Sequence, residues 1–207
     1  MPTIKNNLAL ISAALYVASQ LIANVLSTKI ALLPWVNLAM DGGTVIYPLT
    51  FTLRDFVHKT AGKKSARVVV CTAAGINLAM VILFYLVGKL PAEPSWAFQA
   101  DYQNILTPVF RIVLASVISQ VISELIDTEI FSRIYHRFND LAGSLLSNTV
   151  ALVADSFLFC LIAFAGVMPF SVVMSIIFSN ILVKFVLSAA SAPAIKLIPR
   201  TVDFDEI

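Results

Sequence analysis

The hydrophobic residues of this 207-residue chain are gathered in long blocks that short polar stretches separate. A helix needs about 20 predominantly apolar residues to cross roughly 30 Å of hydrocarbon. Six blocks approach or reach that length, and they cover Leu8–Thr28, Gly43–Lys59, Ala66–Val87, Ile105–Ile126, Ser144–Phe164 and Phe170–Ala192. We therefore predict an all-α membrane protein with six transmembrane helices in one compact bundle. Because little sequence remains outside the blocks, residues 1–207 are expected to form a single integral membrane domain.

Composition supports this interpretation, since 59% of the residues are hydrophobic and the mean hydropathy is +0.90. The first block is interpreted as a retained helix rather than a signal peptide. It is longer than the hydrophobic region of a signal peptide, and it lacks a convincing small-residue cleavage site. The polar stretch Leu32–Gly43, which contains a Pro, a Trp and two Gly residues, is expected to be an external loop.

The basic residues indicate how the helices are oriented. Nine of the fourteen Lys and Arg residues lie in alternate segments, at Lys5, at Lys59, Lys63, Lys64 and Arg67, at Arg133 and Arg137, and at Lys196 and Arg200. Short loops that are rich in Lys and Arg stay in the cytoplasm. Both termini are therefore predicted to be cytoplasmic, and five spans would break the alternation. The basic cluster at 63–67 has no interleaved aromatic residues, so we expect no nucleic-acid partner.

Charged residues also occur inside the hydrophobic blocks, at Arg54, Asp55, Glu124, Asp127, Asp155 and Lys184. A charge at the centre of a bilayer costs about 2.5–3.5 kcal/mol on insertion scales. Such residues almost always face a protein interior or a wet cavity, where they mark a substrate or ion pathway. The pattern favours a small multi-pass transporter.

Polar residues in the first block share one helix face. Tyr16, Gln20, Asn24 and Thr28 recur every four residues, which places them one above the other on a helix. They either line a cavity or form hydrogen bonds between helices, which amide side chains commonly do in membranes.

The second block contains Pro48, which removes a backbone donor and predicts a kink or break near Thr44–Tyr47. Broken helices at membrane depth occur where the backbone is buried in protein or lines a cavity.

The last three blocks supply the clearest candidates. Gln120, Glu124 and Asp127 share one face of the fourth block, although Asp127 could instead form an interfacial ion pair. In the fifth block, Asn148 and Asp155 lie two turns apart on one face, and Asp155 lies near the middle of its span with no local basic partner. Lys184 in the sixth block lies one turn after Asn180. It is the expected counter-charge for Asp155 or Asp127, in a structural or a substrate-linked role.

Enzymatic chemistry is not indicated by the sequence. Cys71 and Cys160 lie in apolar blocks without metal-ligand spacing, so we interpret them as packing residues. The chain has no His-Glu-x-x-His or Gly-x-Ser-x-Gly pattern, and no nucleotide-binding glycine loop. We therefore expect no catalytic residues, no bound metal and no cofactor. Any ATP-driven step would need a second protein.

Several longer motifs resemble a known family. They are the run Tyr47-Pro-Leu-Thr-Phe-Thr-Leu-Arg-Asp55, the run Gly62-Lys-Lys-Ser-Ala-Arg67, Leu125-Ile-Asp127 with Phe131, and Asp155-Ser-Phe-Leu-Phe159 followed by Ala163-Phe164. Together they resemble the vitamin uptake transporter family, better known as queuosine precursor transporters. The resemblance implies a six-span inner-membrane protein that imports deazaguanine bases, the precursors of a modified tRNA base. It also implies functional roles for Asn24, Asp55, Asp127 and Asp155.

The chemistry of such a substrate fits the residues. A guanine-type base carries two adjacent N–H donors, and a carboxylate can accept both in the bidentate manner in which it accepts a guanidinium. Stacking on an aromatic ring is worth about 1–3 kcal/mol per base in nucleic-acid binders. The predicted substrate-binding residues are Gln20, Asn24, Tyr47, Phe51, Asp55, Glu124, Asp127, Asn148, Asp155 and Lys184.

The alternative is a membrane-embedded binding subunit for another small heterocycle or vitamin, which needs a separate energising partner. In both cases the expected partners are a small heterocycle and membrane lipid. The small size of the chain permits a homodimer without requiring one.

Overall fold

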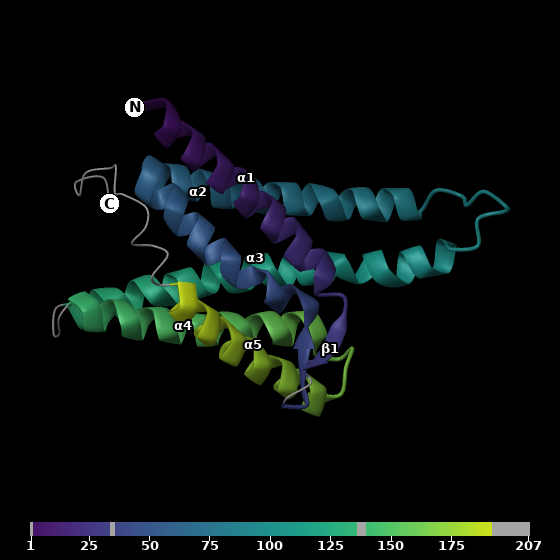
Figure 1. Cartoon of the computed structure of the whole chain (residues 1–207). Helices are drawn as coiled ribbons and strands as arrows, with labels where there is room; N and C mark the ends of the chain where they lie inside the picture. Colours follow the sequence, from purple (N-terminus) through teal and green to yellow (C-terminus); the bar gives the residue numbers. More distant parts are fainter. Residues whose placement is uncertain (1, 34–35, 136–139, 192–207) are drawn as a thin grey trace.

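The computed structural model describes residues 2–33, 36–135 and 140–191. Within these ranges, the side chains at 2–6, 48, 51, 55, 59, 63, 124, 127–128, 130–135, 140–148 and 188–191 lie outside the described part. The elements are α1 (Pro2–Leu26), β1 (Ile30–Leu33), β2 (Leu38–Asp41), the 3-10 helix η1 (Gly42–Val45), α2 (Tyr47–Gly88), α3 (Gln99–Tyr135), α4 (Asp140–Phe164) and α5 (Phe170–Ser191). The described chain is thus mostly helical, as predicted (Figure 1).

The helix α2 consists of two parts that run in different directions (Figure 1). They meet at Gly62, whose backbone has φ 85° and ψ 169°. This conformation is essentially confined to glycine, because a Cβ atom would clash with the backbone. The second and third hydrophobic blocks are therefore joined by a break at one residue. The chain changes from η1 to α2 at Ile46, with Pro48 in the first turn of α2, so the break near Thr44–Tyr47 is confirmed.

Four helical segments in the described part are long and apolar enough to cross a membrane: Asn7–Leu26, Lys64–Gly88, Gln99–Ser123 and Phe170–Leu187. They correspond to the first, third, fourth and sixth predicted spans. The fifth block retains a shorter apolar helix at Thr149–Phe164 in the described residues. The second block forms η1 and the first part of α2, where Thr, Arg and His side chains lower its hydropathy. Six spans and cytoplasmic termini remain predictions.

The stretch predicted as an external loop contains a β-hairpin, which an all-α fold does not include. Strands β1 and β2 pair antiparallel from Ile30↔Asp41 to Leu33↔Leu38. The backbone turns through Asn37, whose φ of 53° suits Asn better than most residues. Strand β2 lies against α5, since the Ala39 N–H donates to Ser175 Oγ (2.8 Å) and Ser179 Oγ donates to the Ala39 carbonyl (2.6 Å). The end of the predicted loop is therefore buried inside the protein.

The hydrophobic core is divided among the helix pairs. The largest cluster joins α3, α4, α5 and β2 around residues such as Ile112, Cys160 and Ile176. A second cluster joins α2 and α3 around Val81 and Val109. Many large apolar side chains point outward instead, among them Leu10, Leu83, Phe170 and Phe178. Outward-facing apolar side chains of this kind are expected where helices meet lipid tails.

Arg111, which lies inside a hydrophobic block, has a structural partner. Its Nε and one terminal nitrogen donate to the backbone carbonyls of Ile162 and Ala165, each at 2.6 Å. The Ile162 carbonyl lies in the last turn of α4 and Ala165 directly follows the helix, where unpaired acceptors carry a partial negative charge. The Arg111 charge therefore joins α3 to the end of α4.

Candidate functional site

A polar pocket with an empty volume of about 320 Å³ lies between the helices. We call it the central pocket. Every described helical element and the end of the hairpin contribute to its wall: Ala23, Asn24 and Ser27 from α1, Asp41, Gly43 and Thr44 from β2 and η1, Tyr47 from α2, Ser116 and Ser119 from α3, Asp155 and Phe159 from α4, and Asn180 and Lys184 from α5. Residues far apart in sequence thus share one cavity.

An ion pair lies in this wall. Lys184 Nζ is 2.7 Å from Asp155 Oδ2, and the two side chains are only 4% and 8% exposed. The structure therefore pairs Lys184 with Asp155, one of the two partners expected from the sequence. A buried pair of this kind avoids the large cost of two separate charges. Within the described residues, Oδ1 of Asp155 receives no hydrogen bond.

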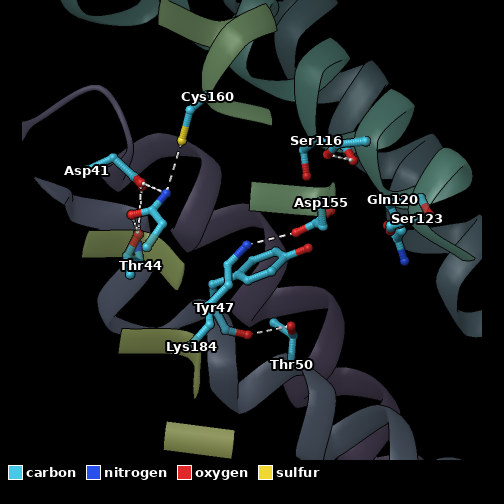
Figure 2. Close-up of polar contacts among 12 residues, drawn as sticks. Asp41, Thr44, Tyr47, Thr50, Ser116, Gln120, Ser123, Asp155, Cys160 and Lys184 are labelled. Atoms are coloured by element: carbon cyan, nitrogen blue, oxygen red, sulfur yellow. Dashed lines mark hydrogen bonds and ion pairs between the residues drawn. The ribbon is translucent and has the colours of Figure 1, made fainter. Parts of the chain in front are cut away.

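The aromatic ring of Tyr47 lies against the same ion pair. Lys184 Nζ is 4.5 Å from the ring centroid, within the range of a cation–π interaction. Figure 2 shows the Lys184 amine beside the Tyr47 ring, with a dashed line to the Asp155 carboxylate. Tyr47 owes its position to the start of α2 directly after η1. The pocket thus combines a flat apolar surface with a cation and a carboxylate.

The polar face of α1 points inward. Asn24 Nδ2 donates to Asn77 Oδ1 (2.7 Å), and Gln20 Nε2 donates to the Tyr16 hydroxyl (3.2 Å). These residues line a neighbouring pocket of about 250 Å³, which shares Asn24 and Ser116 with the central pocket. The two interpretations of this face both apply, because its residues line cavities and also join α1 to α2. Thr28, by contrast, bonds back to the Val25 carbonyl.

Asp41 belongs to the site although the sequence placed it in an external loop. It is 2% exposed. Its Oδ1 accepts hydrogen bonds from Ser27 Oγ (2.7 Å) and from the Thr44 N–H (3.2 Å). Its Oδ2 lies 2.8 Å from Thr44 Oγ1 and 2.7 Å from Asn180 Nδ2. Asn180 was noted only as a neighbour of Lys184, so both residues were missed as site residues.

Two glycines explain how Asp41 reaches this place. A Cβ atom at Gly43 would collide with Ser27 Oγ and the Ala23 carbonyl oxygen, and one at Gly42 would collide with the Leu26 carbonyl oxygen. The backbone after Asp41 therefore packs directly against the end of α1. An Asp followed by two Gly and a Thr is the signal that could have identified this close approach, because Asp also caps the start of η1.

Five predicted site residues cannot be placed. The side chains of Phe51, Asp55, Glu124, Asp127 and Asn148 lie outside the described part of the structure. Of the other five, Asn24, Tyr47, Asp155 and Lys184 line the central pocket, and Gln20 lines its neighbour. Among the described residues, no cluster of three or more His, Cys, Asp or Glu side chains could hold a metal ion.

Comparisons with known proteins agree with the motifs. Residues 41–198 match the family model described as "Putative vitamin uptake transporter". The chain is also similar to the "Probable queuosine precursor transporter" of Bacillus subtilis (strain 168), with 29% identity over 168 residues, which cover 76% of this chain and 72% of that protein. No solved structure shows a significant match. The resemblance inferred from the motifs is therefore confirmed at the level of the family. With its four candidate spans, the chain is a multi-pass membrane protein that belongs to the vitamin uptake transporter family.

Proposed function

We propose that this protein imports a queuosine precursor, a deazaguanine-type base, across the inner membrane. The observation that carries the proposal is the buried Asp155–Lys184 pair in the wall of a pocket of about 320 Å³. The similarity to a queuosine precursor transporter supports this choice of substrate. Membership in a family of transporters implies a non-enzymatic function.

The pocket offers each group that a deazaguanine needs. Asp155 carries an oxygen that the described residues leave available for the paired N–H donors of the base. The rings of Tyr47 and Phe159 provide aromatic surfaces, and Lys184 can donate to the carbonyl of the base. Asn24 adds an amide at the boundary with the neighbouring pocket. A carboxylate, a cation and aromatic faces around one cavity favour a flat and polar ligand over a lipid or an ion.

Lys184 is paired with Asp155, and we propose that Asp127 makes a second contact with the base. We propose that Asp55, Glu124, Asn148 and Phe51 complete the transport path.

Uptake by the purified protein tests the proposal. Proteoliposomes that contain only this protein should exchange internal unlabelled deazaguanine for external labelled base. Asp155→Asn should weaken binding of the base by about tenfold to a hundredfold, because it turns one acceptor into a donor that faces the donors of the ligand. A buried donor without a partner costs about 1–3 kcal/mol. Asp101→Asn, at an exposed position in the first turn of α3, is the matched control.

The same measurement separates the alternative. A binding subunit that depends on an energising partner would bind the base with similar affinity but would exchange none of it when reconstituted alone. Exchange by the purified protein therefore supports a self-sufficient transporter. Wild-type exchange together with unchanged binding in Asp155→Asn would show that this carboxylate is structural.

A further inference from the structure

The amide of Asn24 in the wall of the central pocket is held by a second amide, that of Asn77 in α2. Asn24 Nδ2 donates to Asn77 Oδ1 (2.7 Å), and Asn77 Nδ2 donates to the backbone carbonyl of Ala73 (2.9 Å). Asn24 is 5% exposed and Asn77 is 3% exposed. Asn24 lines the central pocket, while Asn77 lines the neighbouring pocket. We call this chain of contacts, from Ala73 through Asn77 to Asn24, the amide relay.

One backbone group fixes the orientation of both amides. A carbonyl oxygen only accepts hydrogen bonds, so the Asn77 atom that lies 2.9 Å from the Ala73 carbonyl must be the nitrogen. The oxygen of Asn77 then faces Asn24, and at 2.7 Å it needs a donor. That donor is the nitrogen of Asn24. The contacts thus determine which atom is nitrogen in each amide, as hydrogen-bond networks do in X-ray structures.

The relay also prevents the Asn24 amide from turning over. Half a turn would bring its oxygen against Asn77 Oδ1, where two lone pairs would meet at 2.7 Å. Turning Asn77 as well would only move the conflict to the Ala73 carbonyl, at 2.9 Å. A buried polar contact without a hydrogen atom is costly. Asn24 therefore keeps its nitrogen on Asn77.

The oxygen is the free atom of the Asn24 amide. Within the described residues, Asn24 Oδ1 accepts no hydrogen bond. Nitrogen and oxygen leave the amide carbon in different directions, so Oδ1 faces away from Asn77. Buried polar atoms in native proteins nearly always have a partner. An acceptor that is buried in the wall of a pocket, with no partner among the described residues, therefore suits an N–H group of a ligand.

A deazaguanine carries such a group apart from the two adjacent donors that suit Asp155. The N–H of its five-membered ring lies on a different edge of the base. Asn24 and Asp155 belong to different walls of the central pocket, on α1 and α4. We propose that Asn77 is a positioning residue that holds Asn24 Oδ1 toward this N–H, so that the site selects ligands with a donor at this place. The inference rests on the proposed transport of a deazaguanine.

Binding of two probes to the purified protein tests the inference. One probe is deazaguanine, and the other is its furan analogue, in which an oxygen atom replaces the N–H of the five-membered ring with little change of shape. The wild type should bind deazaguanine at least about tenfold more tightly than the analogue. The reason is that the ring oxygen of the analogue would face Asn24 Oδ1 without a hydrogen atom between them.

Asn77→Leu removes the relay while it keeps a side chain of similar size. The Asn24 amide can then turn and donate to the ring oxygen of the analogue, so the preference for deazaguanine should disappear. A residue that merely joins α1 to α2 would weaken the binding of both probes equally and leave the preference intact, and that result would overturn the positioning role. Asn104→Leu, at an exposed position of α3, is the matched control and should keep the preference.

Asn77→Asp tests the relay with a conservative change. It keeps an oxygen that accepts from Asn24 Nδ2, so it should retain the preference that Asn77→Leu loses, and loss of the preference in Asn77→Asp would overturn the inference. Asn77→Ala takes the place of Asn77→Leu if that variant does not fold, with the same expected loss. Equal binding of both probes by the wild type would overturn the role of Asn77 alone, whereas binding of neither probe would overturn the proposed function itself.

Discussion

At the scale of single residues, the ion pair between Lys184 and Asp155 serves two purposes. It neutralises two charges that the sequence places inside apolar helices, and it presents both of them to the central pocket. Structural and substrate-linked roles of Lys184 therefore coexist. A buried pair contributes little net stability, but removal of one partner leaves an uncompensated charge.

The first prediction concerns this pair. Lys184→Met should destabilise the purified protein by about 3–5 kcal/mol, because Asp155 is left buried and unpaired. The double variant Lys184→Met/Asp155→Asn should regain part of that loss, since neither charge remains. Thermal unfolding in detergent measures both, with Lys64→Met at an exposed position as the control. If the loss of stability in the double variant equalled the sum of the losses in Lys184→Met and Asp155→Asn, the two residues would not interact.

The second prediction concerns Gly43. Gly43→Ala should cost about 1–3 kcal/mol, as overpacking of a filled interior does, because the new Cβ collides with Ser27 and the Ala23 carbonyl. Gly75→Ala in α2 is the matched control for Gly43→Ala. Nothing lies within 4 Å of its added Cβ atom, and Ala forms helices better than Gly does. The two variants should therefore shift the unfolding temperature in opposite directions. Equal shifts would mean that the hairpin can move away from α1.

At the scale of elements, the helices were predictable and the hairpin was not. The length and apolar composition of the hydrophobic blocks anticipated the described α-helices, since lipid requires the backbone to satisfy its own hydrogen bonds. The stretch 30–41 has no such pattern, because its strands are short and their order depends on contacts with Ser175 and Ser179 in α5. Asp41 was missed for the same reason. Asp155 and Lys184 were found because charge inside an apolar block is visible in the sequence itself.

The third prediction concerns the break in α2. Gly62→Ala should destabilise the protein by about 1–3 kcal/mol, because the backbone at this position adopts a conformation that is essentially restricted to glycine. Thermal unfolding of Gly62→Ala, compared with that of the control Gly75→Ala, measures the loss of stability. If Gly62→Ala is instead as stable as the wild type, the two parts of α2 are not held at a fixed angle by this residue.

At the scale of the whole molecule, the helices define which parts of the chain can cross a membrane. The described structure contains four segments that are long and apolar enough to span, together with a shorter apolar helix in α4. The first part of α2 is short and polar, and its start supplies Tyr47 to the pocket. We expect the basic segments to lie in the cytoplasm and the loop between α2 and α3 to lie outside.

The fourth prediction concerns this topology. Single cysteines at Ser65 and Ser95 should react with a membrane-impermeant thiol reagent from opposite sides of the membrane. The two native cysteines, the exposed Cys71 and the buried Cys160, must first be replaced in the protein used for labelling. Labelling of both positions from the same side would contradict the six-span arrangement with cytoplasmic termini. Opposite labelling would support it independently of any substrate.

The contact between Asp41 and Asn180 has a consequence for biosynthesis. The two residues are 139 positions apart, so Asp41 leaves the ribosome long before its partner exists. At roughly 5–20 residues per second, the interval is about 7–30 s. During that time α1, the hairpin and α2 are present while the polar contacts of Asp41 are still incomplete. The last helix therefore completes the polar contacts of Asp41, and a chain that ends before α5 would lack the hydrogen bond from Asn180 to this carboxyl group.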